Sequence, residues 1–140
     1  MLATHMDIHA IVNLARKFNE ESENALPFDP VLFSCTVADC IMKEDRACFV
    51  ERDGGRAYAF LLAVLSPYPA APIMQANELL WYCDPAKRGK GAVRLFNEYL
   101  YWAESSGAGV IYCGAFEGMA AKLYERNGFR RIDENWAKVR

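Results

Sequence analysis

Apolar residues recur at helical spacing near the start of the chain. The stretch Asp7–Glu23 predicts an amphipathic helix whose apolar side consists of Ile8, Ile11, Val12, Ala15 and Phe18. Pro27 interrupts the pattern. Asp29 followed by Pro30 is typical of a helix start, so a second helix is predicted to run toward Met42.

The middle of the chain changes to a strand-like pattern. Ala47–Glu51 and Ala57–Leu65 predict a hairpin, because the connection Arg52–Arg56 contains an Asp-Gly pair suited to positive φ angles. The second of these strands is apolar at nearly every position, which indicates burial on both faces and helices on each side of the sheet. A proline-rich loop, Ser66–Pro72, separates it from a third predicted strand, Gln75–Cys83.

The last third of the chain alternates between the two patterns. The predicted elements are a helix over Ala92–Ser106, a strand over Val110–Cys113, a helical face formed by Met119, Ala120, Leu123 and Tyr124, and two closing strands, Phe129–Ile132 and Trp136–Val139. Gly128, in the left-handed conformation, is expected to end the last helix. The order predicts an α+β fold with α/β-type layers, in which a mixed, mostly antiparallel central sheet has helices on both faces.

Composition and charge narrow the class of protein. The 140 residues are 53% apolar and contain no repeat or linker, so a single domain over residues 1–140 is expected. The net charge of −2 gives no general attraction to nucleic acid or to an anionic membrane. The longest apolar run, Ala57–Leu65, is about half of a membrane-spanning helix, and the N-terminus has no signal-peptide pattern. We therefore expect a cytoplasmic protein whose five cysteines are reduced.

One segment has a pattern suited to anion binding. The five residues Arg88, Gly89, Lys90, Gly91 and Ala92 lie between a predicted strand and a predicted helix, where backbone N–H groups converge on a ligand. The glycines allow close approach of the backbone, and the two cationic side chains add charge. A tight structural connection between strand and helix is an equally good interpretation of this pattern.

Two well-known nucleotide motifs are excluded by their spacing. The triphosphate-binding loop requires a glycine five residues before Gly89 and a Ser or Thr after Lys90, and the sequence has neither. The dinucleotide-binding fingerprint requires a third glycine at the position of Arg94.

The segment resembles the signature of the GCN5-related N-acetyltransferase (GNAT) superfamily, Arg/Gln-x-x-Gly-x-Gly/Ala. Here it reads Arg88–Val93, and it follows Trp81–Pro85, which is similar to the end of the family's preceding strand. A second hallmark, a helix with Leu-Tyr-Glu before a Gly-Phe stop, is matched by Ala120–Phe129. The order of elements also matches from residue 7 onward, so the resemblance covers nearly the whole chain.

The resemblance implies an acyl-CoA-dependent N-acyltransferase that transfers acetyl from acetyl-CoA to a primary amine by direct attack. It places the pyrophosphate on the glycine turn and pairs the pantetheine arm with strand backbone. The implied CoA-binding residues are Trp81, Cys83, Arg88, Gly89, Lys90, Gly91, Ala92 and Val93. The chain departs from the family pattern at Val93 and at Glu117, and the family's first strand is barely visible in Met1–Met6.

Two catalytic roles follow from the resemblance. Tyr124 corresponds to the tyrosine that stabilises the departing thiolate, with a core aromatic as its alternative role. Glu78 is the candidate base, with an ion pair or an outward-facing carboxylate as its alternative. Regular alternation along the strand would place Glu78 with Tyr82, on the face opposite Trp81 and Cys83, unless a bulge changes the register.

Other candidate sites have simpler interpretations. His5 and His9 lack a clear third ligand, so no metal is expected. Cys83 and Cys113 are expected to be structural thiols. The basic C-terminal residues are interpreted as strand-edge charges that deter aggregation; they are Arg130, Arg131, Lys138 and Arg140.

Partners and rival functions stay open at this stage. The resemblance implies an acceptor pocket near Asn24–Phe33 and Asp133–Asn135 for a small-molecule or peptide amine, whose identity is undetermined. The alternative functions are a non-catalytic acyl-CoA-binding or protein-interaction module with the same fold, and a structural subunit. A homodimer is possible, and neither nucleic acid nor membrane is expected as a partner.

Overall fold

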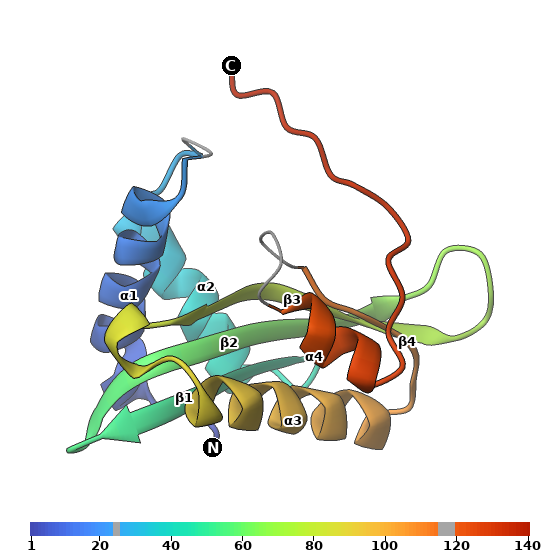
Figure 1. Ribbon diagram of the computed structural model, residues 1–140, viewed down its shortest axis with the longest axis horizontal. Helices are drawn as coiled ribbons and strands as arrows, with labels where there is room; N and C mark the ends of the chain where they lie inside the picture. Colours follow the sequence, from blue (N-terminus) through green and yellow to red (C-terminus); the bar gives the residue numbers. More distant parts are fainter. Residues whose placement is uncertain (24–25, 115–119) are drawn as a thin grey trace.

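The computed structural model describes residues 1–23, 26–114 and 120–140 (Figure 1). Its elements are a 3₁₀ turn at His5–Asp7, α1 (Ile8–Glu21), α2 (Pro30–Met42), β1 (Arg46–Asp53), β2 (Arg56–Pro67), β3 (Met74–Cys83), a 3₁₀ turn at Pro85–Lys87, α3 (Lys90–Ser105), β4 (Ala108–Tyr112) and α4 (Ala121–Arg126). These confirm the predicted helices and the first four predicted strands, with ends that differ by a few residues. None of the helices in the described segments is long and apolar enough to span a membrane.

The strands form one mixed sheet in the order β1-β2-β3-β4. The first two pairs are antiparallel and the third, β3 with β4, is parallel. Gly54 and Gly55 make the hairpin turn between β1 and β2, with φ of 55° and 79°, which only glycine adopts without strain. The predicted hairpin is confirmed, and its two central residues are both glycine.

Helices cover both faces of the sheet, as expected from the apolar β2 strand. Helices α1 and α2 pack on one face, while α3 packs on the other (Figure 1). The apolar residues of β2 therefore divide between two cores: Phe60 and Leu62 face α1 and α2, whereas Ala59 and Leu61 face α3. All four are buried.

The N-terminal residues attach to the free edge of β1. Ala3 donates its backbone N–H to the carbonyl of Cys48, and Val50 donates to the carbonyl of Met1, so that Leu2 and Phe49 form an isolated bridge. The first strand expected in Met1–Met6 is therefore reduced to a single bridge.

The two closing strands predicted for residues 129–140 are absent. This segment leaves α4 after Gly128, whose φ of 82° confirms the predicted helix stop, and then runs away from the body without helix or strand (Figure 1). Its apolar residues Ile132, Trp136 and Val139 are exposed, with Trp136 at 90%. A ribbon of two four-residue strands is marginal unless it packs on a larger sheet, and this tail makes no such packing.

An ion pair connects the start of α1 to the sheet. Asp7 is only 4% exposed and accepts two hydrogen bonds from Arg52 of β1, at 2.8 Å to Nε and 2.5 Å to Nη2. It also accepts the backbone N–H of Thr4 at 2.7 Å. The bond to Arg52, more than any other contact, holds the pKa of Asp7 below its usual value of 3.8.

We predict that Asp7→Asn lowers the free energy of unfolding by roughly 2 kcal/mol at pH 7, because it leaves the Arg52 guanidinium without a counter-charge. A carboxyl with a lowered pKa stabilises the fold above pH 3.8 and loses this effect as the pH falls through its folded value. Urea unfolding at pH 7 and pH 3 measures both effects, and the difference between wild type and variant must shrink at pH 3. Asp39→Asn is the control, since Asp39 forms an exposed pair with Lys43.

Candidate functional site

The candidate site begins where the pairing of β3 with β4 ends. The parallel register runs from Met74 to Asn77 on β3 and stops at the pair Asn77 and Tyr112. In the described part of the chain, the rest of this β3 edge, from Glu78 to Cys83, has no strand beside it. The edge is thus available at the position where the resemblance places the pantetheine arm.

A bulge in β3 changes the direction of Glu78. Leu80 lies opposite Leu62, but Glu78 lies opposite Ala63, so Leu79 is the extra residue. Regular alternation therefore does not hold, and the alternative of a bulge is confirmed. The bulge places Glu78 on the face that packs against α3, where its carboxylate interacts with Tyr99. Tyr82 remains on the other face and donates its hydroxyl to Glu21 of α1.

The Glu78 carboxylate is partly buried and forms no salt bridge with any described residue. Its Oε2 accepts the backbone N–H of Gly114 at 2.9 Å. Burial raises the pKa of Glu78 to about 6, and the Gly114 hydrogen bond partly opposes that rise. A carboxyl with this pKa changes protonation close to neutral pH, as a general base must.

Tyr124 comes from α4 and lies on the same face as Glu78. Its hydroxyl donates to the carbonyl of Gly114 at 2.5 Å. Burial raises the pKa of Tyr124, and the nearby Cys113 and Glu78 raise it further. The hydroxyl therefore stays protonated at neutral pH and can donate a proton or a hydrogen bond.

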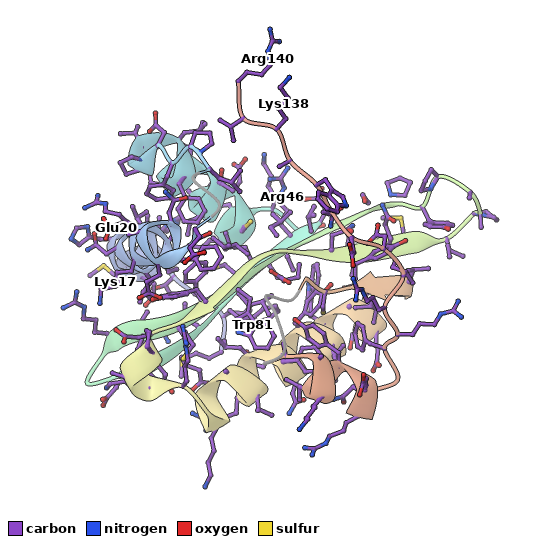
Figure 2. The ribbon with its side chains drawn as sticks, turned by 45° about the horizontal axis from the view of Figure 1, so that its top comes forward. Lys17, Glu20, Arg46, Trp81, Lys138 and Arg140 are labelled. Atoms are coloured by element: carbon purple, nitrogen blue, oxygen red, sulfur yellow. The ribbon has the colours of Figure 1, made fainter. Side chains whose placement is uncertain are left out.

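The ring of Tyr124 belongs to an aromatic cluster beside the open edge of β3. Trp81 stacks on Phe96 of α3 with ring centroids 5.8 Å apart and an interplanar angle of 13°. Tyr124 and Phe129 pack against Phe96 at 5.4 and 5.8 Å. Figure 2 shows Trp81 on the side of the sheet that faces α3. The ring of Tyr124 thus packs in the core, while its hydroxyl lies at the candidate site.

The predicted anion-binding turn lies at the start of α3. Gly89 is the N-cap residue, with φ of 132° and ψ of −122°, a conformation that requires glycine. A Cβ built at Gly89 would meet no atom within 4 Å, so the space in front of it is open. The first backbone N–H groups of α3 have no partner within the helix, and Lys90 is exposed beside them. Geometry and charge here fit a phosphate group.

Gly91 is required for a different reason. A Cβ at this position would lie 2.3 Å from the hydroxyl of Tyr58 on β2. That hydroxyl lies 3.5 Å from Nη2 of Arg94, which in turn forms a bidentate pair with the buried Glu51. The second glycine of the signature is therefore fixed by packing of α3 on the sheet.

The other residues predicted to bind CoA have mixed surroundings. Arg88 donates to the carbonyl of Cys83 at 3.4 Å and lies 3.8 Å from the Glu21 carboxylate, so its charge is directed toward α1. The Cys83 thiol is buried, and burial raises its pKa, which agrees with a structural role. Val93 is 41% exposed. Ala92 is partly buried and packs against the core beneath α3.

Some predictions fall outside the described residues, and some site residues were missed. Glu117 and Met119, like Asn24 at the edge of the implied acceptor pocket, lie outside the described ranges. Sequence reasoning missed Gly114, although a glycine directly after a predicted strand is a recognisable signal. Burial raises the pKa of the Cys113 thiol, which agrees with the structural role predicted for it, and the Glu78 carboxylate raises that pKa further.

No group of three or more potential metal ligands occurs in the part of the chain that the structure describes. His9 lies within 3.4 Å of Asn13, on the exposed side of α1. The site therefore consists of the open β3 edge, the turn before α3, and the side chains of Glu78 and Tyr124.

Solved structures with the same architecture cover almost the whole chain. A protein described as a transcriptional regulator from Bacillus halodurans C-125 has a TM-score of 0.78 at 20% identity, covering 99% of this chain and 97% of its own. A ribosomal-protein-alanine N-acetyltransferase from Brucella melitensis biovar Abortus 2308 has a TM-score of 0.71 at 17% identity, and the match covers 100% of this chain and 96% of the other. An acetyltransferase from Trypanosoma brucei has a TM-score of 0.75 at 17% identity, and the match covers 99% of this chain and 96% of the other. No family model and no curated protein matches the sequence. At these identities the likeness shows the fold, which is that of acetyltransferases.

We predict that Gly91→Ala destabilises the protein by about 1–3 kcal/mol, because the new methyl group overlaps the Tyr58 hydroxyl. Adding Tyr58→Phe should restore part of this loss, since the remaining ring atoms would lie beyond 3.0 Å. Thermal or urea unfolding of the two single variants and the double variant measures the effect. If the double variant is as unstable as expected for independent losses, the contact does not explain Gly91.

We predict that Glu78→Gln raises the free energy of unfolding relative to wild type, and that this gain is larger at pH 8 than at pH 4. The raised pKa means that the unfolded state ionises first, so stability falls as the pH rises from about 4.5 to about 6. Between pH 4 and pH 8 this ionisation lowers the free energy of unfolding of wild type by roughly 2 kcal/mol, and the glutamine variant does not lose this stability. Urea unfolding at both pH values measures it, with Glu104→Gln on the exposed end of α3 as control. An equal pH dependence for all three proteins would contradict the buried carboxylate.

Proposed function

We propose that this chain, which has the GNAT fold, is an acyl-CoA-dependent N-acyltransferase that transfers acetyl from acetyl-CoA to a primary amine. One observation carries the proposal: Glu78 and Tyr124 meet at Gly114, next to the part of the β3 edge that pairs with no strand among the described residues. This gives the site a group that can accept a proton and a group that can donate one.

The turn before α3 supports the binding of the co-substrate. The pyrophosphate would lie against the N–H groups after Gly89, with Lys90 supplying charge. The pantetheine arm would add to the open edge of β3 at Trp81 and Cys83, in the manner of an extra strand. The thioester would then lie near Glu78, where the pairing with β4 has ended.

The chemistry of the proposed step balances without an acyl-enzyme. Glu78 takes one proton from the ammonium form of the acceptor, directly or through a water. The amine nitrogen then attacks the thioester carbon, a C–N bond forms, and the C–S bond breaks with its electron pair on sulfur. Tyr124 donates its proton to the sulfur and is reprotonated, through water, by the second proton that the nitrogen loses. Glu78 passes the first proton to solvent. The products are an amide, CoA as thiol, and one proton released to solvent.

We predict that the purified chain binds CoA and releases it from acetyl-CoA when a suitable amine is present. Calorimetry measures binding, and a thiol reagent measures CoA release over a panel of polyamines, lysine peptides, peptide N-termini and small amines. For an active acceptor, kcat/KM should fall below a pH near 6, as Glu78 becomes protonated. Tyr124→Phe should lower kcat roughly 100-fold, and Glu78→Gln should remove the acidic limb.

The rival function is a non-catalytic acyl-CoA-binding module. It predicts that CoA raises the unfolding temperature while no amine gives turnover above that of Tyr124→Phe. Lys90→Glu tests the turn, because it reverses the charge beside the N–H groups without the steric clash that substitution of Gly91 causes. It should weaken CoA binding, whereas Arg16→Glu on the exposed side of α1 should not. Absence of CoA binding by the folded wild type would overturn both functions.

A further inference from the structure

Gly114 contacts both proposed catalytic side chains through its backbone. Its N–H donates to Oε2 of Glu78 at 2.9 Å, and its carbonyl accepts from the hydroxyl of Tyr124 at 2.5 Å. The residue lies two positions beyond Tyr112, the last residue of β4. One residue of the main chain thus connects a strand residue, Glu78, with a helix residue, Tyr124.

We propose that Gly114 is a positioning residue that holds Glu78 and Tyr124 at a fixed separation, so that the base and the acid act as a coupled pair. The proposal rests on the proposed acyl transfer. Each hydrogen bond uses a different group of Gly114, so both can exist together. The main chain at this position therefore determines where the amine and the sulfur can meet the two side chains.

The coupling between the two side chains has an electrostatic basis. Burial is the main cause of the raised pKa of Tyr124, and the charge of the Glu78 carboxylate raises it further, which makes the hydroxyl a weaker donor. When Glu78 takes a proton from the amine, that charge disappears, and the hydroxyl becomes a better donor as the C–S bond breaks. Among the described residues, the other titratable groups that interact with Glu78 are Tyr99 of α3 and Cys113, both of which stay neutral because burial raises their pKa values.

The hydroxyl of Tyr124 must also change its partner during the reaction. It donates to the Gly114 carbonyl in this structure, and it has one proton. Donation to the sulfur therefore requires the hydroxyl to leave that carbonyl. The Gly114 carbonyl therefore holds the Tyr124 hydroxyl before the reaction. The hydroxyl leaves this carbonyl when it donates to the sulfur.

The experiment removes the Gly114 N–H and measures the titration of Glu78 in the folded protein without any acyl-CoA. Gly114→Pro deletes the donor, and an ester in place of the amide between Cys113 and Gly114 deletes it without a ring, should the proline variant not fold. Gly114→Ala is the matched control: it keeps the N–H, the backbone there has no positive φ, and its Cβ would lie 3.6 Å from Oε2 of Glu78, an ordinary contact.

We predict that loss of the N–H raises the pKa of Glu78 by about one pH unit, a tenfold change in proton affinity. Carbon-13 NMR of labelled glutamate carboxyls, with Glu78→Gln for assignment, measures it, and the alanine variant should titrate as wild type does. The acidic limb of kcat/KM should move with the carboxyl. An unchanged titration in the ester protein overturns the proposal. A shifted titration without acyl transfer to any amine overturns the proposed function and the coupled pair with it, and leaves only the hydrogen bond from Gly114 to Glu78.

A double-variant cycle tests the coupling itself. If Glu78 and Tyr124 act as a pair, the double variant Glu78→Gln with Tyr124→Phe should lose little more kcat than the worse single variant. Multiplication of the two single losses would show independent action and contradict the pairing.

Discussion

The end of the β3–β4 pairing is the constraint on which the site depends. Up to Asn77 the two strands share main-chain hydrogen bonds, and one residue later the carboxylate of Glu78 takes the place of a strand partner for the N–H of Gly114. The Leu79 bulge makes this possible, because it directs Glu78 to the face of α3. Without the bulge, the carboxylate would face α1 and α2, far from Tyr124.

The helices then complete the site from the other face. Helix α3 supplies the Phe96 ring on which Trp81 stacks, and its N-terminus supplies the turn. Helix α4 adds Tyr124 to the same cluster. Packing, charge and the open strand edge therefore act within one region, and the burial that stabilises the aromatic cluster is also the cause of the raised pKa of Glu78.

Much of the fold could be predicted from periodicity and turn chemistry. Helix α2 begins at the predicted Asp29 cap, and β2 is buried on both faces as its apolar pattern indicates. A bulge in β3 could be considered from the sequence, but its presence and position could not be predicted, because one inserted residue leaves no mark in the composition of a strand. The prediction of two closing strands was wrong, because a local alternation pattern does not show whether the segment can pair with the edge of a sheet. The residue types at Glu78 and Tyr124 could be selected from the sequence, but their meeting at Gly114 required the tertiary structure.

The contact between Gly91 and Tyr58 separates the origin of a motif from its use. Packing of α3 against Tyr58 on β2 favours glycine at this position independently of any ligand. A chain with this fold but another function would still gain stability from a glycine at this position. A glycine at position 91 of the signature is therefore evidence for the fold. Evidence for activity must come from positions that helix packing does not constrain.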